Sequence, residues 1–270
     1  MHEFVSLDSQ IIRAREAVLP AISNAALYGK GVFTTVAMYD GEPFLWEKHW
    51  YRLTENAVRL GIDFTELSES FLRNALDAIV AKNSVLNGRA RITIFDTSPG
   101  VLWRIESAQN TRLLITTAEP REISNEFHLT VSPYTVNSQS PLAGAKSCNY
   151  FENVLAHNEA RGCGFDEAIR LNERRGVVSA CMANIFWQKD DRLFTPSLKT
   201  GCLAGTTRAF VIENLKCEEV ESKLGELRDA DAVYLTSAGI GIIAVAEFDR
   251  RKFAAVKSQI TSLLPPKNHT

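Results

Sequence analysis

The sequence lacks the features that mark secreted, membrane-spanning or nucleic-acid-binding proteins. Its five cysteines are odd in number and scattered, and no CxxC pair occurs, which argues against a disulfide framework and against a zinc site. A net charge of −2 gives no support for binding to a phosphate backbone. No apolar run approaches the roughly 20 residues that cross a bilayer, and the first residues do not follow the pattern of a secretory signal. We therefore expect a reduced, cytoplasmic protein that binds neither nucleic acid nor membrane.

Several common functional motifs are also missing. The chain contains no GxxxxGK[ST], no GxGxxG and no HExxH, and its five histidines show neither metal-ligand nor catalytic-triad spacing. We therefore expect no metal site.

The composition is that of an ordinary globular protein, with 45% hydrophobic and 23% charged residues. At 270 residues, the chain is long enough for one large domain or two smaller ones. In the first part, strands are predicted over 32–38, 89–95 and 112–117, helices over 47–60 and 66–82, and a loop over 96–110. An Asp-Gly turn at 40–41 indicates a hairpin. This pattern predicts a small α+β domain over 1–119.

The polar, proline-containing stretch 120–126 is predicted to be a linker, and 127–270 a second, larger domain. The predicted strands there cover 127–133, 168–171, 176–179, 184–188, 192–195, 232–236 and 240–246. Helices are predicted from near Asn149, over 205–215 and over 251–264. Many strands with few helices favour a β-rich, barrel-like domain.

Two segments could carry chemistry. Lys146 follows a soft run of small residues and precedes a helix, where Asn149 and Glu152 have the spacing of a capping box. A lysine in this place is accessible to a bound ligand, although most lysines are solvated surface charges. The loop 201–205 leads to Thr206 and Thr207 at a predicted helix start, which suits a phosphate but is also typical of an ordinary capped helix.

Seven segments together, in this order, resemble those of the fold type IV pyridoxal-phosphate enzymes, the class IV aminotransferase family. They are YGKGVFTT, HWYRL, KSCNY, GFDEAIRL, ANIF, LAGTTR and DADAVYLTSA, between residues 28 and 238. The family includes branched-chain aminotransferases, D-amino-acid transaminases and 4-amino-4-deoxychorismate lyase. The resemblance implies a small N-terminal α/β sandwich, a larger C-terminal β-rich pseudo-barrel with helices, and a homodimer.

The resemblance also implies a cofactor, pyridoxal 5'-phosphate, and roles for single residues. Lys146 would bind the cofactor aldehyde covalently and then act as the base for the substrate α-proton. Tyr150 lies near the position that donates a hydrogen bond to the cofactor's phenolic oxygen. The phosphate would be bound by four residues, Arg52, Thr206, Thr207 and Ser237.

One departure from the family pattern concerns the pyridine nitrogen of the cofactor. The family's glutamate at that place falls on Ser179, which carries no charge and can at most form a hydrogen bond with a neutral pyridine. Two interpretations remain open. Either Ser179 serves a chemistry that needs a weaker electron sink, or catalysis has decayed and the protein only binds a ligand.

Within the family, the sequence Phe33-Thr34-Thr35 follows the lyase pattern, and Thr35 matches a threonine thought to help proton transfer there. The lyase releases pyruvate from aminodeoxychorismate and leaves 4-aminobenzoate. The alternatives are an aminotransferase for branched-chain or D-amino acids and the decayed ligand-binding protein. The stretch 96–99 lacks the Arg-Gly common after the equivalent strand, so the sequence does not show how a substrate carboxylate is bound.

Overall fold

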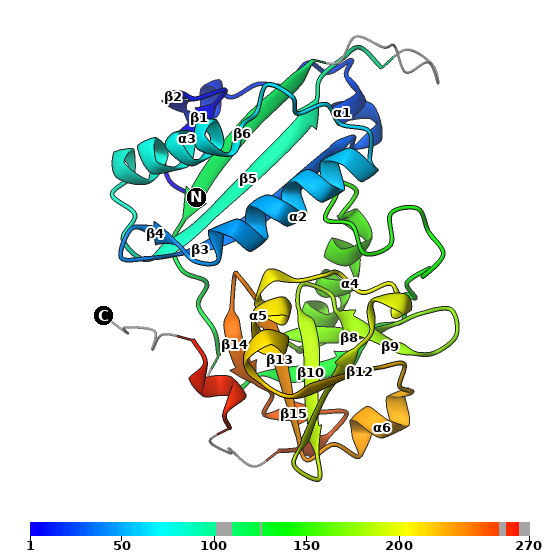
Figure 1. Ribbon diagram of the computed structural model, residues 1–270. Helices are drawn as coiled ribbons and strands as arrows, with labels where there is room; N and C mark the ends of the chain where they lie inside the picture. Colours follow the sequence, from blue (N-terminus) through cyan, green and yellow to red (C-terminus); the bar gives the residue numbers. More distant parts are fainter. Residues whose placement is uncertain (101–109, 125, 254–257, 265–270) are drawn as a thin grey trace. The chain divides into compact units, whose positions relative to one another are not determined.

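The chain forms two compact units in the computed structural model, which describes residues 1–100, 110–124, 126–253 and 258–264 (Figure 1). The first unit consists of Met1–Arg121 together with Lys146–Tyr150, and the second of Glu122–Ala145 and Phe151–Thr270. The division near Arg121 lies within the expected linker. The lysine segment differs from expectation, because Lys146–Tyr150 groups with the first unit and not with the second.

The first unit is built on a six-stranded antiparallel sheet in the order β2-β1-β6-β5-β3-β4. Its strands are β1 (Phe4–Leu7), β2 (Gln10–Arg13), β3 (Gly31–Tyr39), β4 (Glu42–Pro43), β5 (Gly88–Asp96) and β6 (Thr111–Ala118). The three strands predicted over 32–38, 89–95 and 112–117 are confirmed, and positive φ angles at Asp40 and Gly41 form the expected turn. The sequence did not predict β1 and β2, because these strands are short and β2 is largely exposed.

Two helices, α2 (Trp46–Arg59) and α3 (Glu69–Lys82), lie across one face of this sheet (Figure 1). Apolar side chains of α2, α3, β3, β5 and β6 form one buried core between helices and sheet. Helix α3 begins three residues later than predicted because the Ser68 hydroxyl caps it by accepting the Phe71 N–H at 3.2 Å. A short helix that the sequence did not predict, α1 (Asn24–Tyr28), precedes β3.

The second unit contains two open five-stranded sheets. One has the order β16-β15-β7-β8-β9, with β7 (His128–Val131), β8 (Glu167–Leu171), β9 (Val177–Ala180), β15 (Glu247–Phe248) and β16 (Arg251–Lys252). The other has the order β12-β11-β10-β13-β14, with β10 (Asn184–Lys189), β11 (Arg192–Pro196), β12 (Cys217–Val220), β13 (Ala232–Ser237) and β14 (Gly241–Ala244). A shared apolar core joins both sheets. The predicted α+β organisation is confirmed, and the barrel-like part is realised as two open sheets packed on each other.

Helices cover the outer faces of these two sheets. Helix α4 (Phe151–Gly162) packs on β8 through small residues, and α5 (Thr206–Asn214) packs on β13. A third helix, α6 (Leu224–Arg228), follows β12. Among the described residues, no helix has the length and apolar character needed to cross a membrane.

Two expectations about helix ends are wrong. The capping box of Asn149 and Glu152 does not describe the start of α4, because the helix begins at Phe151 and the Glu152 carboxylate instead binds Arg170. The closing helix over 251–264 is replaced at its start by β16 and near its end by a 3-10 turn, Ile260–Ser262. Residues 254–257 lie outside the described residues.

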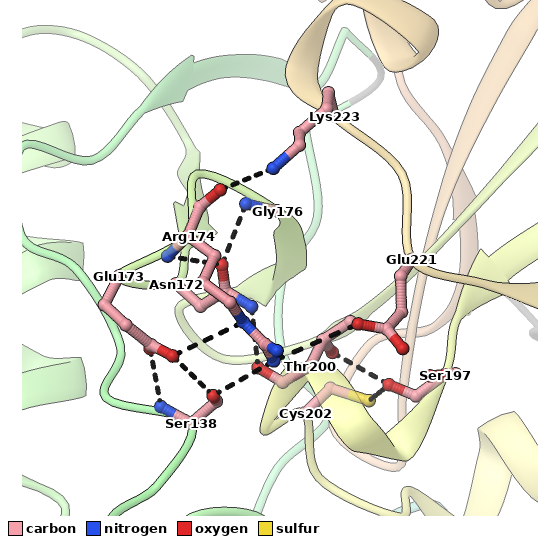
Figure 2. A network of polar contacts seen from close by, with 10 residues as sticks. All are labelled: Ser138, Asn172, Glu173, Arg174, Gly176, Ser197, Thr200, Cys202, Glu221 and Lys223. Atoms are coloured by element: carbon pink, nitrogen blue, oxygen red, sulfur yellow. Dashed lines mark hydrogen bonds and ion pairs between the residues drawn. The ribbon is translucent and has the colours of Figure 1, made fainter.

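A polar network fixes the loop that leads into α5 (Figure 2). The Asn172 side chain accepts the Gly176 N–H at 2.8 Å and donates to the Thr200 carbonyl at 3.3 Å, which joins the β8–β9 turn to this loop. The Ser138 hydroxyl donates to the Glu173 carboxylate at 2.7 Å beside it. The loop is therefore tied to the β8–β9 turn before α5 begins.

Asn184 and Gly205 make the closest approach in this region. The Asn184 amide donates to the Leu203 carbonyl at 2.8 Å, and a β carbon at Gly205 would lie 2.0 Å from Asn184 Oδ1. Only a residue without a side chain fits at this position, so Gly205 allows β10 to hold the start of α5.

We expect Gly205→Ala to lower the free energy of unfolding by about 1–3 kcal/mol, because Asn184 must move and lose its hydrogen bond. The measurement is urea denaturation followed by circular dichroism. Gly225→Ala is the matched control, because Gly225 lies in α6 with open space around it. Alanine there should leave stability unchanged or raise it by up to about 1 kcal/mol. Equal effects of the two substitutions would contradict the close approach at Gly205.

Candidate active site

The segment that carries Lys146 runs along the edge of β3. The Phe33 N–H donates to the Lys146 carbonyl at 3.0 Å, and the Cys148 N–H donates to the Gly31 carbonyl at 2.8 Å. Ser147 and Val32 form the antiparallel bridge between these bonds. The backbone from Lys146 to Cys148 is therefore held against β3.

The amine of Lys146 lies over two aromatic rings. Its Nζ atom is 4.4 Å from the centre of the Phe33 ring and 4.5 Å from that of Tyr150, and it donates to the Tyr150 hydroxyl at 3.4 Å. No carboxylate forms a salt bridge with this amine in the described part of the chain. Burial first, and then the charges of Arg52 and Arg91, hold the pKa of Lys146 well below its usual value.

Arg52 comes from α2 and is buried beside β3. Its Nη2 atom donates to the Thr34 hydroxyl at 2.8 Å, and this hydroxyl lies 2.6 Å from Nδ1 of His49. Burial, followed by the charges of Arg52 and Lys146, holds the pKa of His49 well below its usual value, so the imidazole is neutral. We assign the Thr34 hydroxyl proton to His49 Nδ1, which leaves the hydroxyl oxygen to accept from the guanidinium. Burial lowers the pKa of Arg52 to about 10, and the group stays a cation at neutral pH.

Arg91 approaches the same place from β5. Its guanidinium carbon lies 3.6 Å from the centre of the Phe33 ring, and its Nε atom donates to the Thr93 hydroxyl at 3.2 Å. Burial lowers the pKa of Arg91 from its usual value, against a smaller opposite effect of Cys148. Arg91 pairs directly with Thr35 across the β3–β5 ladder, so Thr35 shares its face of the sheet.

This arrangement has two chemical consequences. An amine with a lowered pKa is available as the free base, which can attack a carbonyl or remove a proton. The two guanidinium groups favour anions beside that amine, and a bound anion would in turn raise its proton affinity. The first unit thus places an amine with a lowered pKa and two guanidinium cations in one cluster.

The remaining predicted residues lie in the second unit. Thr206 and Thr207 are buried in the first turn of α5, whose N-cap, Gly205, has no side chain to cap the helix. Ser237 ends β13, one residue after Thr236, which pairs with Asn184. Because Asn184 also holds the Leu203–Gly205 loop, it joins the end of β13 to the start of α5. Ser179 lies in β9 and pairs with Arg170.

The predicted residues thus form two groups. Arg52, Lys146 and Tyr150 come together in the first unit, and Thr35 lies on the same face of the sheet as Phe33. The second group, in the other unit, contains Ser179, Thr206, Thr207 and Ser237. The sequence prediction of the cluster omitted three residues that contact it, Thr34, His49 and Arg91.

Two of these omitted residues left a signal in the sequence. His49 stands three residues before Arg52, one helical turn away, which places the two side chains on one helix face. Thr34 is adjacent to Thr35, and strand alternation assigns only one of them to each face. Arg91 left no such signal, because its place depends on the pairing register between β3 and β5.

Comparison with known proteins identifies the family. The sequence profile of the family described as "Amino-transferase class IV" matches residues 31–248. The aminodeoxychorismate lyase of Bacillus subtilis (strain 168) is 28% identical over an alignment of 270 positions, which covers 96% of this chain and 92% of that protein.

Two solved structures share the fold over nearly the whole length of both chains. The branched-chain aminotransferase from Thermoproteus uzoniensis, solved with norvaline, has a TM-score of 0.88 and 26% identity, and covers 96% of this chain and 91% of its own. The 4-amino-4-deoxychorismate lyase from Pseudomonas aeruginosa has a TM-score of 0.82 and 25% identity, with 94% of both chains covered. The chain is an enzyme that belongs to the class IV aminotransferase family.

Proposed function

We propose that this enzyme is a pyridoxal-5'-phosphate-dependent 4-amino-4-deoxychorismate lyase, which releases pyruvate and leaves 4-aminobenzoate. The observation that supports it most is the amine of Lys146, which is desolvated and close to two arginines, and which no carboxylate of the described residues neutralises. Similarity to the Bacillus subtilis lyase over nearly the whole chain supports the choice of reaction.

The residues present suit the proposed cofactor. A free amine at Lys146 can bind an aldehyde, and the buried Arg52 guanidinium, presented by Thr34, can bind a phosphate through charge-assisted hydrogen bonds. In the second unit, the hydroxyls of Thr206 and Thr207 stand in the first turn of α5, a position that suits a phosphate. When bound, pyridoxal phosphate supplies an electron sink for the charge left on the substrate after proton loss.

The chain's own side chains would move the protons. Lys146 Nζ would take the substrate α-proton, because its lowered pKa increases the fraction of amine present as the free base. The Tyr150 hydroxyl lies 3.4 Å from that amine and would orient it. The Phe33 ring, whose centre is 4.4 Å from the amine, would limit the access of water to it. Thr35, on the face of Phe33 and Arg91, would assist proton transfer to the departing group.

Arg91 can supply the arginine for a substrate carboxylate that the stretch 96–99 lacks. Asp96 at the end of β5 forms a salt bridge with Lys30 at 2.7 Å, so this lysine is already paired with a carboxylate. Arg91 is an exposed cation near the Lys146 amine and can bind a substrate carboxylate. Aminodeoxychorismate carries carboxylates, which agrees with a cationic lining.

An aminotransferase acting on branched-chain or D-amino acids is the second candidate, supported by the similarity to the Thermoproteus uzoniensis enzyme. Ser179 favours the lyase over this candidate. Without a carboxylate at the ring nitrogen the electron sink is weaker, and a reaction driven by aromatisation of its product tolerates that better than amino transfer does. We also propose that the enzyme is a cytoplasmic homodimer, as the family resemblance implies.

The first test supplies purified protein with pyridoxal phosphate and aminodeoxychorismate, without any amino acceptor. We expect equal amounts of 4-aminobenzoate and pyruvate, measured by chromatography and by coupled pyruvate reduction. Amino transfer to 2-oxoglutarate from leucine or D-alanine, with no 4-aminobenzoate formed, would replace the lyase with an aminotransferase.

The second test concerns the cost of keeping Lys146 uncharged. A lysine whose pKa is lowered in the folded state destabilises that state as pH falls from about 10.4, where the unfolded lysine titrates, toward the folded pKa. Lys146→Met should therefore raise the Tm of the cofactor-free protein at pH 7 by about 2–4 °C. The gain should shrink toward pH 10.

Thermal unfolding by calorimetry measures this difference. Lys199→Met serves as the control, because Lys199 is exposed and should change stability by less than about 0.5 kcal/mol at either pH. A Tm for Lys146→Met below that of the unchanged protein at pH 7 would show that the charged amine stabilises the fold.

The third test separates phosphate binding from aldehyde binding. Arg52→Gln should raise the Kd for pyridoxal phosphate about 10–100-fold, the loss of one charge-assisted hydrogen bond. The Kd for pyridoxal, which has no phosphate, should stay within about twofold. Arg59→Gln removes the same charge from an exposed position on the same helix and should change neither. Equal loss of both ligands in Arg52→Gln would mean that Arg52 does not bind the phosphate.

A further inference from the structure

The residue that pairs with Ser179 is a buried arginine. Arg170 in β8 stands directly opposite Ser179 in β9, in an antiparallel ladder, so the two side chains lie on the same face of the sheet. The β carbons of such a pair are about 5 Å apart. The Arg170 side chain is only 1% exposed, and the residue is among the largest fully buried ones in the chain.

The hydrogen bonds of Arg170 use only part of its guanidinium group. Nε donates to the Tyr134 carbonyl at 3.1 Å, and Nη2 donates to the Glu152 carboxylate at 2.7 Å and the Thr135 carbonyl at 3.4 Å. Nη1 is buried and has no hydrogen-bond partner among the described residues. A buried N–H group left without a partner costs about 1–3 kcal/mol, so this atom suits an acceptor supplied by a ligand.

The carboxylates near the sheet face of Arg170 and Ser179 do not cancel the positive charge of Arg170. Glu152 from α4 binds Arg170, but its side chain is 61% exposed and therefore solvated. Glu159 lies two turns further along α4, where it accepts from the Cys163 thiol. Glu167 in β8 is held by the Cys181 and Met182 N–H groups at 3.0 and 3.1 Å, beyond the end of β9. The group directly beside Ser179 is thus a cation.

We propose that Arg170 acts together with Ser179 on the pyridine nitrogen of the cofactor, and that this pair keeps the nitrogen unprotonated. The inference rests on the proposed function and on the correspondence of Ser179 to the family's glutamate. A nearby cation lowers the proton affinity of a basic nitrogen, and the Ser179 hydroxyl can donate to its lone pair. Arg170 would act through its charge on the nitrogen, beside the hydroxyl of Ser179, and is in this sense a positioning residue.

The pair would determine which reactions proceed. A neutral pyridine withdraws fewer electrons, so charge left on the substrate after proton loss is stabilised less. Amino transfer depends on that stabilisation in both of its halves. Pyruvate loss from aminodeoxychorismate is driven by the aromatic product, so the Arg170–Ser179 pair selects elimination against amino transfer.

The test is the 15N NMR resonance of pyridoxal phosphate labelled at the ring nitrogen and bound to the full-length protein, recorded from pH 6 to pH 9. Reference positions come from protonated and unprotonated pyridoxal phosphate in solution. We expect the resonance of the unprotonated form throughout this range. A protonated nitrogen at neutral pH in the unchanged protein would overturn the inference.

Three substitutions sharpen the experiment. Ser179→Glu and Arg170→Met should each raise the proton affinity of the bound nitrogen at least tenfold, whereas Arg170→Lys keeps the cation and should leave the resonance nearly unchanged. If Arg170 only supports the fold, Arg170→Lys and Arg170→Met should give the same resonance as the unchanged protein. That result would also overturn the inference.

Two further measurements keep the outcomes distinct. Circular dichroism and Tm of each cofactor-free variant show whether that variant folds. The further variant Glu152→Gln removes the carboxylate partner of Arg170 and leaves the charge of Arg170 in place. We expect Glu152→Gln to keep the nitrogen unprotonated, and a protonated nitrogen there would contradict the assignment to Arg170. Equilibrium dialysis with pyridoxal phosphate tests the proposed function separately: no binding by the unchanged protein would refute that function, while binding with a protonated nitrogen would refute the Arg170 inference alone.

Discussion

The amine of Lys146 can act as a nucleophile because no carboxylate in the described part of the first unit forms a salt bridge with it. Two arginines approach it from α2 and β5, two aromatic rings lie beneath it, and the described residues form no salt bridge with it. Burial and the two guanidinium charges make the ammonium form less favourable, and the attraction of the aromatic rings for a cation does not offset them. An uncompensated amine of this kind would destabilise the empty protein. Such an arrangement is expected where a ligand supplies the missing negative charge, and a phosphate with a substrate carboxylate would do so.

The same constraint explains the details around the cluster. Arg52 must remain a cation despite burial, and the Thr34 hydroxyl with neutral His49 gives it a polar partner without introducing a negative charge. A carboxylate in place of Thr34 would neutralise the guanidinium before a phosphate could bind. In the second unit, Gly205 and Asn184 hold the start of α5 in place. The direction of the N–H groups at this helix start is therefore set by the contact with β10.

The sequence predicts the helices and strands that have strong local patterns. It does not predict contacts between residues that depend on how the strands pair. The central strands of the first sheet and α2 follow from hydrophobic periodicity, and Lys146 and Arg52 were singled out on motif order. The grouping of Lys146 with the first unit was not foreseen, because it comes from the bridge of its neighbours to β3. The pairing of Arg170 with Ser179 could not be read from the sequence either, since the turn between β8 and β9 and a local irregularity set that register.

The central claim is that the Lys146 amine binds the cofactor aldehyde, and the most direct measurement is borohydride reduction of the protein incubated with pyridoxal phosphate, followed by proteolysis and mass spectrometry. We expect one reduced cofactor adduct, located on the peptide that contains Lys146. An adduct spread over exposed lysines, or no adduct on that peptide, would contradict it.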